Sequence, residues 1–321
     1  MKSARDLALE TQFARDVSEG LRAPQKILPA QYLYDAIGSV LFDAITLLPE
    51  YGLTRAEERL LHSHGDDICR IVAPVTAVVE LGSGSGRKTE QILSAMRRRQ
   101  AEVNYFAIDV SRTALRQCCE HLKDVRGIKA HAVQANYLEG LARVRHEIGG
   151  SGRLLLLFLG STIGNFSEAE TASFLKRIRE DLRPGDAFLL GTDLVKAPQR
   201  LLDAYDDALG VTAAFNLNLL ARINSELHGD FQLRKFEHQA RWVVEHSRIE
   251  MHLVSRERQS VNVFAANCRA VFEPGESIWT ESSRKFTKEA VENLALQSRF
   301  DIAGQWIDRE WPFAENLWVA K

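Results

Sequence analysis

The sequence predicts an α/β fold, with a mostly parallel sheet covered by helices on both faces and a second, α+β unit. Between residues 61 and 195, helical and strand-like segments alternate with short turns between them. The central strand-like segments, such as 154–160, are almost entirely apolar, which indicates burial on both faces. After Lys196 this alternation ends. We therefore expect one domain of residues 61–195 plus 286–321, and a second of residues 1–60 plus 196–285.

Composition narrows the class of protein. The chain has 321 residues, enough for about two domains. Its 41 basic and 43 acidic side chains leave a net charge of −2, so we expect neither nucleic acid nor a membrane as partner. No apolar run reaches bilayer length, and the charged N-terminal segment lacks the apolar core of a secretory signal. Four cysteines without CxxC spacing are typical of reduced thiols in a cytoplasmic protein. We also expect a monomer that acts on a small molecule and binds no metal ion.

The first 60 residues predict interrupted helices and no strand. Apolar residues between Leu33 and Ile45 recur at helical spacing, and Pro24 and Pro29 interrupt the pattern before them. We expect this segment to form a helical cap or lid.

The later elements follow from their periodicity and from the turns between them. In order, we expect a helix over 56–72, a strand over 77–81, a helix over 87–99, a strand over 104–109, a helix over 111–125, a strand over 129–136 followed by helical residues, a strand over 154–160, a helix over 167–182, a strand over 186–194, helical segments over 197–227, β-structure between 240 and 285, and a helix over 287–299.

A glycine-rich turn from Glu80 to Gly86 joins the first strand of this series to a helix. Its glycines allow a tight turn and a close approach of backbone to ligand, and the helix N-terminus offers unpaired N–H groups. The dinucleotide motif needs a glycine three residues after Gly84, where Arg87 stands, so a nicotinamide-dependent oxidoreductase is the less favoured alternative. The pattern acid-x-G-x-G-x-G resembles the S-adenosylmethionine loop of the Rossmann-like class I methyltransferases.

Two polar residues at later strand ends extend this cofactor site. Asp109 ends the next strand, 109 − 86 = 23 residues after Gly86, where a carboxylate can accept both ribose hydroxyls; the alternative is a helix N-cap. The amide oxygen of Asn136 can accept from the adenine amino group; the alternative is a turn residue. The cofactor-binding residues that we predict are Glu80, Gly82, Ser83, Gly84, Gly86, Lys88, Asp109, Asn136 and Tyr137.

The loop after the strand 154–160 predicts the place of methyl transfer. It contains Gly160 and Asn165, and an aromatic residue follows Asn165, an arrangement that resembles the loop by which amino-group methyltransferases hold their nucleophile. Two neutral acceptors, the Asn165 amide oxygen and the Gly160 carbonyl, can hold the N–H bonds of an amine while its lone pair points at the methyl group. The alternative is a tight turn in which Asn165 caps the next helix.

Longer strings carry a closer resemblance over essentially the whole chain. YLYDAIGSVLFDAIT, LPEY, VELGSGS, FLGSTIGN, LLGTDLVK, AYDDALGVTAAFN, RIEM and ESSRKF occur in this order. Together they are similar to the L-histidine Nα-methyltransferases of ergothioneine biosynthesis. The resemblance implies trimethylation of the histidine α-amine to hercynine, with S-adenosylmethionine as methyl donor and S-adenosylhomocysteine as by-product.

The resemblance also implies the substrate residues. Tyr34, Tyr51, Asn165 and Tyr205 would surround the amino-acid head group, Glu281 and Ser283 would bind the imidazole, and Met251 would line the ring pocket. Glu281 and Ser283 share a strand face, and a carboxylate with a hydroxyl can pair with both ring nitrogens. The catalytic candidates are Asn165, Gly160 and Tyr34; the proton acceptor is Tyr34, water, or none if the amine arrives deprotonated.

Alternatives and departures accompany this interpretation. The same type of enzyme could act on tryptophan or tyrosine, and a non-catalytic scaffold could share the fold. Asn136 stands where the family usually has an acidic residue, and Gly52 stands where it usually has another aromatic one.

Overall fold

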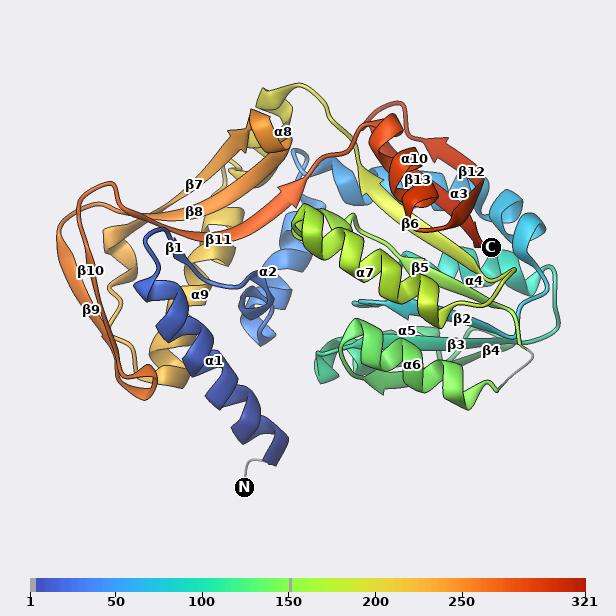
Figure 1. Ribbon diagram of the computed structural model, residues 1–321, viewed down its shortest axis with the longest axis horizontal. Helices are drawn as coiled ribbons and strands as arrows, with labels where there is room; N and C mark the ends of the chain where they lie inside the picture. Colours follow the sequence, from blue (N-terminus) through green and yellow to red (C-terminus); the bar gives the residue numbers. More distant parts are fainter. Residues whose placement is uncertain (1–3, 150–151) are drawn as a thin grey trace. The chain divides into compact units, whose positions relative to one another are not determined.

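The computed structural model describes residues 4–149 and 152–321, and the chain divides into two compact units. Unit 1 comprises Met1–Gly52 and Lys196–Ser283, and unit 2 comprises Leu53–Val195 and Arg284–Lys321 (Figure 1). The predicted boundary after residue 60 falls inside one continuous helix, α3 (Gly52–Val72). It was misplaced because α3 packs its buried residues, such as Leu61 and Ile68, into the core of unit 2.

Unit 2 contains the predicted sheet. Its seven strands lie in the order β12-β13-β6-β5-β2-β3-β4. The five neighbouring strands β6, β5, β2, β3 and β4 are parallel to one another. Strand β13 is antiparallel to both of its neighbours, β6 and β12. The prediction of a mostly parallel sheet is therefore confirmed. The strands are β2 (Ala77–Leu81), β3 (Val103–Asp109), β4 (Ile128–Gln134), β5 (Leu154–Phe158), β6 (Ala187–Asp193), β12 (Phe300–Ile307) and β13 (Phe313–Ala320).

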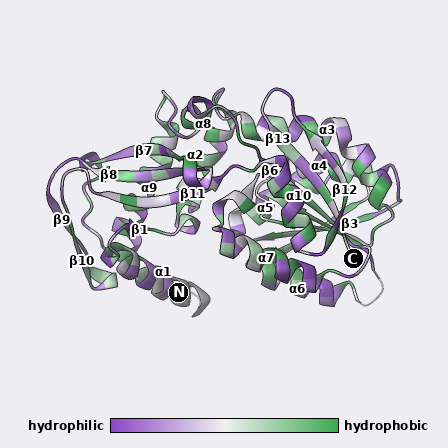
Figure 2. Cartoon of the chain, turned by 45° about the horizontal axis from the view of Figure 1, so that its top comes forward, coloured by the Kyte–Doolittle hydropathy of each residue, from purple (hydrophilic) through white to green (hydrophobic). Residues whose placement is uncertain are grey.

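Helices cover both faces of this sheet, as its apolar strands predict. On one face α3, α4 and α5 pack against side chains such as Val78 and Leu155. On the other face α6, α7 and α10 pack against side chains such as Val79 and Leu156. Their banded colouring in Figure 2 shows the amphipathic character that this packing needs. The bounds are α4 (Thr89–Arg97), α5 (Arg112–Leu122), α6 (Tyr137–Glu147), α7 (Glu168–Asp181) and α10 (Lys288–Gln297).

Unit 1 is the predicted α+β part. It contains a four-stranded sheet in the order β1-β11-β8-β7 and a separate β10-β9 hairpin. Helices α8 and α9 contact β7 and β8, and α2 contacts α9. The elements are α1 (Ala4–Arg22), β1 (Lys26–Ile27), α2 (Ala36–Leu47), α8 (Pro198–Tyr205), α9 (Val211–Leu227), β7 (Phe236–Val243), β8 (Arg248–Ser255), β9 (Gln259–Val263), β10 (Cys268–Phe272) and β11 (Ser277–Arg284).

One detail of unit 1 differs from the predictions. The first 60 residues do contain a strand, because β1 pairs in parallel with Ile278 and Trp279 of β11. Within the β-structure expected between 240 and 285, residues 261–273 belong to a hairpin and not to one continuous strand. The chain turns at the short 3-10 helix Phe264–Ala266 and at Asn267, whose φ of 43° is left-handed.

Further features bear on the class of protein. The four cysteines are free thiols, and three of them are buried. Within the described residues, no single helix has the length and apolar character needed to cross a bilayer; α2 and α3 reach it only as a pair bent by 72°. In the same part of the chain, no group of three or more His, Cys, Asp or Glu side chains could hold a metal ion.

Candidate active site

The cofactor loop begins where β2 ends. Gly82, Gly84 and Gly86 have φ values of 75°, 52° and 73°, a left-handed backbone that glycine adopts without strain. A Cβ on Gly86 would lie 2.6 Å from the Cys118 sulfur, so this position also needs glycine for space. A Cβ on Gly84 would meet nothing within 4 Å. The loop is therefore packed on one side and open at Gly84, as a close approach to a ligand requires.

Glu80 supports this loop from inside the protein. Its side chain is buried, and it accepts hydrogen bonds from the Thr89 hydroxyl, at 2.6 Å, and from the Tyr105 hydroxyl. Burial raises the pKa of Glu80 to about 7. Glu80 thus ties β2 to the first turn of α4, and any effect on a ligand acts through the position of the loop.

Asp109 lies beside the open part of the loop. Its carboxylate accepts the Gly84 N–H at 3.3 Å and the Ser111 N–H at 2.8 Å. Ser111, not Asp109, is the N-cap of α5, so the helix-cap alternative is wrong for Asp109. Burial raises the pKa of Asp109, and these backbone N–H groups oppose that rise. Burial and then the nearby Asp109 charge raise the pKa of Tyr137 to about 12.

Asn136 has a structural role that the sequence left open. It is the N-cap of α6, and its amide oxygen accepts the Glu139 N–H at 2.9 Å. The oxygen that we expected to bind adenine therefore serves the helix, and contact with adenine remains a prediction for this exposed side chain.

The loop after β5 presents the predicted transfer residues. Gly160 and Ser161 have φ values of 74° and 55°, and the Ser161 hydroxyl accepts the Asp193 N–H at 2.8 Å. Asn165 ends the 3-10 helix Thr162–Asn165 and is half-buried. Over residues 4–149 and 152–321, its side-chain amide makes no hydrogen bond.

Asn165 does not cap the next helix. The N-cap of α7 is Ser167, in a capping box with Glu170. The alternative in which Asn165 caps the next helix is therefore wrong. The Asn165 amide remains available to a ligand.

The predicted tyrosines of unit 1 belong to one aromatic cluster. The ring centroids of Tyr51 and Tyr205 are 6.0 Å apart, and those of Tyr51 and Phe42 are 6.3 Å apart. Tyr34 lies 5.5 Å from both Phe42 and Phe215. Sequence reasoning missed Phe42 and Phe215, although both lie in strings that carry the resemblance. The structure thus connects three residues that are up to 171 positions apart (205 − 34).

The predicted ring-binding residues adjoin this cluster. The Tyr205 hydroxyl donates to the Ser283 hydroxyl at 2.8 Å, and both residues are buried. Glu281 is half-buried on the same strand, β11. Met251 is buried on the neighbouring strand β8, where its carbonyl accepts a hydrogen bond from Thr280 of β11 at 3.0 Å.

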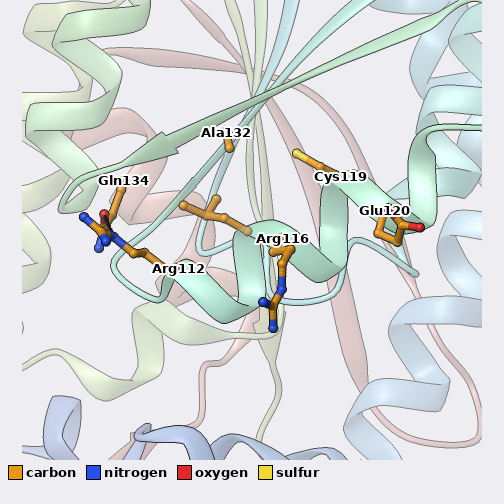
Figure 3. Close-up of a pocket in the computed structure, with 7 residues that line it drawn as sticks. Arg112, Arg116, Cys119, Glu120, Ala132 and Gln134 are labelled. Atoms are coloured by element: carbon orange, nitrogen blue, oxygen red, sulfur yellow. Dashed lines mark hydrogen bonds between the residues drawn. The ribbon is translucent and has the colours of Figure 1, made fainter.

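A surface pocket of about 410 Å³ lies elsewhere, over α5 and the edge strand β4 (Figure 3). None of the predicted site residues lines it. Its lining residues are Arg112, Leu115, Arg116, Cys119, Glu120, Ala132 and Gln134.

The sheet and its loops define the class of protein. A parallel sheet with antiparallel β13 inserted between β12 and β6, and an acid-x-G-x-G-x-G loop after the central strand β2, are the features of a class I S-adenosylmethionine-dependent methyltransferase.

Comparison with known proteins identifies the family. Residues 13–320 match the family described as "Histidine-specific methyltransferase, SAM-dependent", and the chain belongs to that family. It is 43% identical over 317 residues to the histidine N-alpha-methyltransferase of Mycolicibacterium smegmatis, covering 98% of this chain and 97% of the relative. It is 44% identical over 304 residues to that of Mycobacterium tuberculosis, covering 94% and 93%. It is 29% identical over 310 residues to ergothioneine biosynthesis protein 1 of Neurospora crassa, covering 94% of this chain and 34% of that longer protein.

Proposed function

We propose that this chain transfers three methyl groups from S-adenosylmethionine to the α-amino nitrogen of L-histidine, giving hercynine, an early step of ergothioneine biosynthesis. One observation carries the proposal. In the loop after β5 that also contains Gly160, the Asn165 amide is half-buried and makes no hydrogen bond within the described residues. A neutral acceptor in this place suits an amine nucleophile, and membership of a histidine-specific family supports histidine as its source.

Unit 2 has the residues that the cofactor needs. The open backbone at Gly84 admits close approach, the Asp109 carboxylate suits ribose hydroxyls, and the Lys88 ammonium suits a carboxylate. When bound, S-adenosylmethionine supplies an activated sulfonium methyl. The contribution of the protein is then mainly alignment of the nucleophile, which can supply several orders of magnitude in rate.

Alignment is the role that we assign to Asn165 and Gly160. The amide oxygen and the Gly160 carbonyl accept the amine N–H bonds, so that the lone pair is directed at the methyl group. A carboxylate at position 165 would instead stabilise the unreactive ammonium. The amine must lose a proton before each later transfer, and the reaction ends at three because a quaternary nitrogen has no lone pair.

Unit 1 supplies recognition of the amino acid. Glu281 accepts one imidazole N–H, and Ser283, whose oxygen accepts from Tyr205, donates its hydroxyl hydrogen to the other ring nitrogen. An apolar ring would offer these two groups no hydrogen bond, which disfavours phenylalanine. The faces of Tyr34 and Tyr51 suit the methylammonium that forms, through cation–π attraction.

The test is to incubate the protein with S-adenosylmethionine and each of the twenty amino acids, and to measure added methyl groups by mass spectrometry. We expect histidine alone to gain one, two and then three methyl groups. Methylation of tryptophan or tyrosine instead would support the alternative substrates, and cofactor binding without turnover would support a scaffold. A thermal shift with NAD(P) but none with S-adenosylmethionine would point to an oxidoreductase.

A paired variant tests substrate recognition. Ser283→Ala should weaken the preference for histidine, whereas Ser282→Ala, one residue earlier on β11, should leave it unchanged. Equal effects of the two variants would contradict the assignment of Ser283. We also propose that the protein acts as a monomer in the cytoplasm, which native mass measurement and cell fractionation would test.

A further inference from the structure

A buried glutamate that the proposed reaction does not use lies between the two functional loops of unit 2. Glu57 is on α3, and its side chain is 0% exposed. One of its carboxylate oxygens accepts the N–H of Gly160, in the loop that follows β5. The other oxygen forms an ion pair with Lys88, which immediately precedes α4 at the end of the cofactor loop. A single carboxylate therefore contacts both loops.

The absence of a side chain at Gly191 of β6 leaves space for the Glu57 carboxylate. A Cβ on Gly191 of β6 would lie 2.6 Å from a Glu57 oxygen and 3.4 Å from the Gly160 nitrogen. Any side chain at position 191 would therefore intrude on the contact between Glu57 and Gly160. Gly191 has an ordinary φ, since it is not among the residues with positive φ, so space and not backbone conformation calls for glycine here.

Two ionisable side chains adjoin Glu57. Burial acts to lower the pKa of Lys88, but the Glu57 charge and hydrogen bond, together with the nearby Glu80 and Glu315 carboxyls, outweigh burial and raise that pKa. A second buried carboxyl, Glu315 of β13, lies directly across from Gly191 in the strand pairing. Burial and then the Glu57 charge raise the pKa of Glu315 well above its ordinary value, which disfavours a second negative charge here. These directions favour a single buried ion pair, Glu57 with Lys88.

We propose that Glu57 is a positioning residue for methyl transfer, which holds the Gly160 loop and the Lys88 end of the cofactor loop in fixed relation to each other. This inference rests on the proposed function. Because Gly160 and Asn165 belong to one short loop, displacement of the Gly160 amide moves the acceptors that align the amine. Misplacement by about 1 Å can reduce a rate by about a hundredfold.

The test is the variant Glu57→Gln, which keeps the size and one oxygen acceptor but removes the charge. We expect kcat for histidine, at saturating cofactor and histidine, to fall by about tenfold to a hundredfold. Mono- and dimethylhistidine should accumulate, because each round needs a new alignment of the amine. Glu58→Gln on the same helix is the matched control and should keep its kcat within about twofold. A merely structural role would lower the unfolding midpoint without changing kcat per folded molecule or the distribution of products.

A second variant covers the case in which Glu57→Gln fails to fold. Gly191→Ala adds only a methyl group, removes no charge, and should displace Glu57 from Gly160, with the same fall in kcat and the same intermediates. If either folded variant keeps kcat within about twofold at saturating cofactor and shows no accumulated intermediates, the inference is overturned. If the unaltered protein transfers no methyl group to histidine, the proposed function itself fails, which is a different result.

Discussion

The buried carboxyl of Glu80 predicts a specific dependence of stability on pH. Burial raises its pKa from 4.5 to about 7 in the folded protein. As pH rises above about 4.5, the unfolded chain releases this proton first, so the stability that the group contributes is complete at lower pH and is lost as pH rises through 7. Each pKa unit corresponds to about 1.4 kcal/mol, so the full loss is about 3 kcal/mol.

The perturbation is Glu80→Gln, which cannot ionise and can still accept from Thr89 and Tyr105. We expect the free energy of unfolding of the unaltered protein, minus that of the variant, to fall by about 2–3 kcal/mol between about pH 5 and pH 8. The assay is urea denaturation of both proteins at several pH values. Taking the difference cancels the titration of groups distant from Glu80.

Asp207→Asn provides the control for this measurement. Burial acts to raise the pKa of Asp207, but the Thr212 and Val211 N–H groups outweigh it and lower the pKa overall. The stability that Asp207 contributes is present above its unfolded pKa and lost only as pH falls through its lower folded pKa. The corresponding difference should therefore be flat between about pH 5 and pH 8. A flat difference for Glu80→Gln as well would mean that the Glu80 carboxyl does not titrate near pH 7 in the folded protein.

Four further predictions concern the site. Asp109→Ala should weaken S-adenosylmethionine binding by about tenfold or more in a titration, through loss of a charge-assisted hydrogen bond. Asn136→Ala should change that affinity less, but should cost about 0.5–2 kcal/mol of stability through loss of the α6 cap. A larger loss of affinity in Asn136→Ala than in Asp109→Ala would contradict both expectations. Asn165→Asp should lower kcat by about tenfold or more by stabilising the ammonium, so an unchanged kcat would remove Asn165 from the alignment step. Tyr205→Phe should raise KM for histidine by about tenfold through the lost bond to Ser283, while cofactor affinity stays unchanged; equal loss of both would mean general misfolding.

The parts of the fold that could be predicted are those in which local pattern and tertiary burial agree. The strand expected over 77–81 is β2, and the strand expected to end at Asp109 is β3. Both are mostly apolar, both are bounded by turn residues, and both are largely buried in the sheet. The glycine loop could also be predicted. Its three glycines have left-handed φ values, and a residue with a side chain would be strained at these positions.

The parts that could not be predicted depend on distant partners. Strand β1 has only two residues, and it exists because Lys26 and Ile27 pair with β11, 252 positions further on (278 − 26). Glu57 has the sequence context of an ordinary helix-surface acid, in RAEER. Only the assembled sheet places it against Gly160 and Lys88. Both sets of contacts join residues that are far apart in the sequence, so local sequence patterns do not predict them.

Three polar residues at or after the ends of strands in unit 2 show what the structure adds to such a prediction. Asp109, Asn136 and Asn165 each had two interpretations from sequence, as a ligand-binding group or as a structural group of a turn or helix cap. The residue that caps each following helix separates these interpretations. Asn136 caps its helix, whereas Ser111 and Ser167 cap the helices after Asp109 and Asn165. A neighbouring serine that takes over the cap releases the preceding polar side chain for another use, and Asn165, whose side-chain amide makes no hydrogen bond among the described residues, is the clearest case. The identity of the true cap is therefore physical evidence about function, independent of any resemblance.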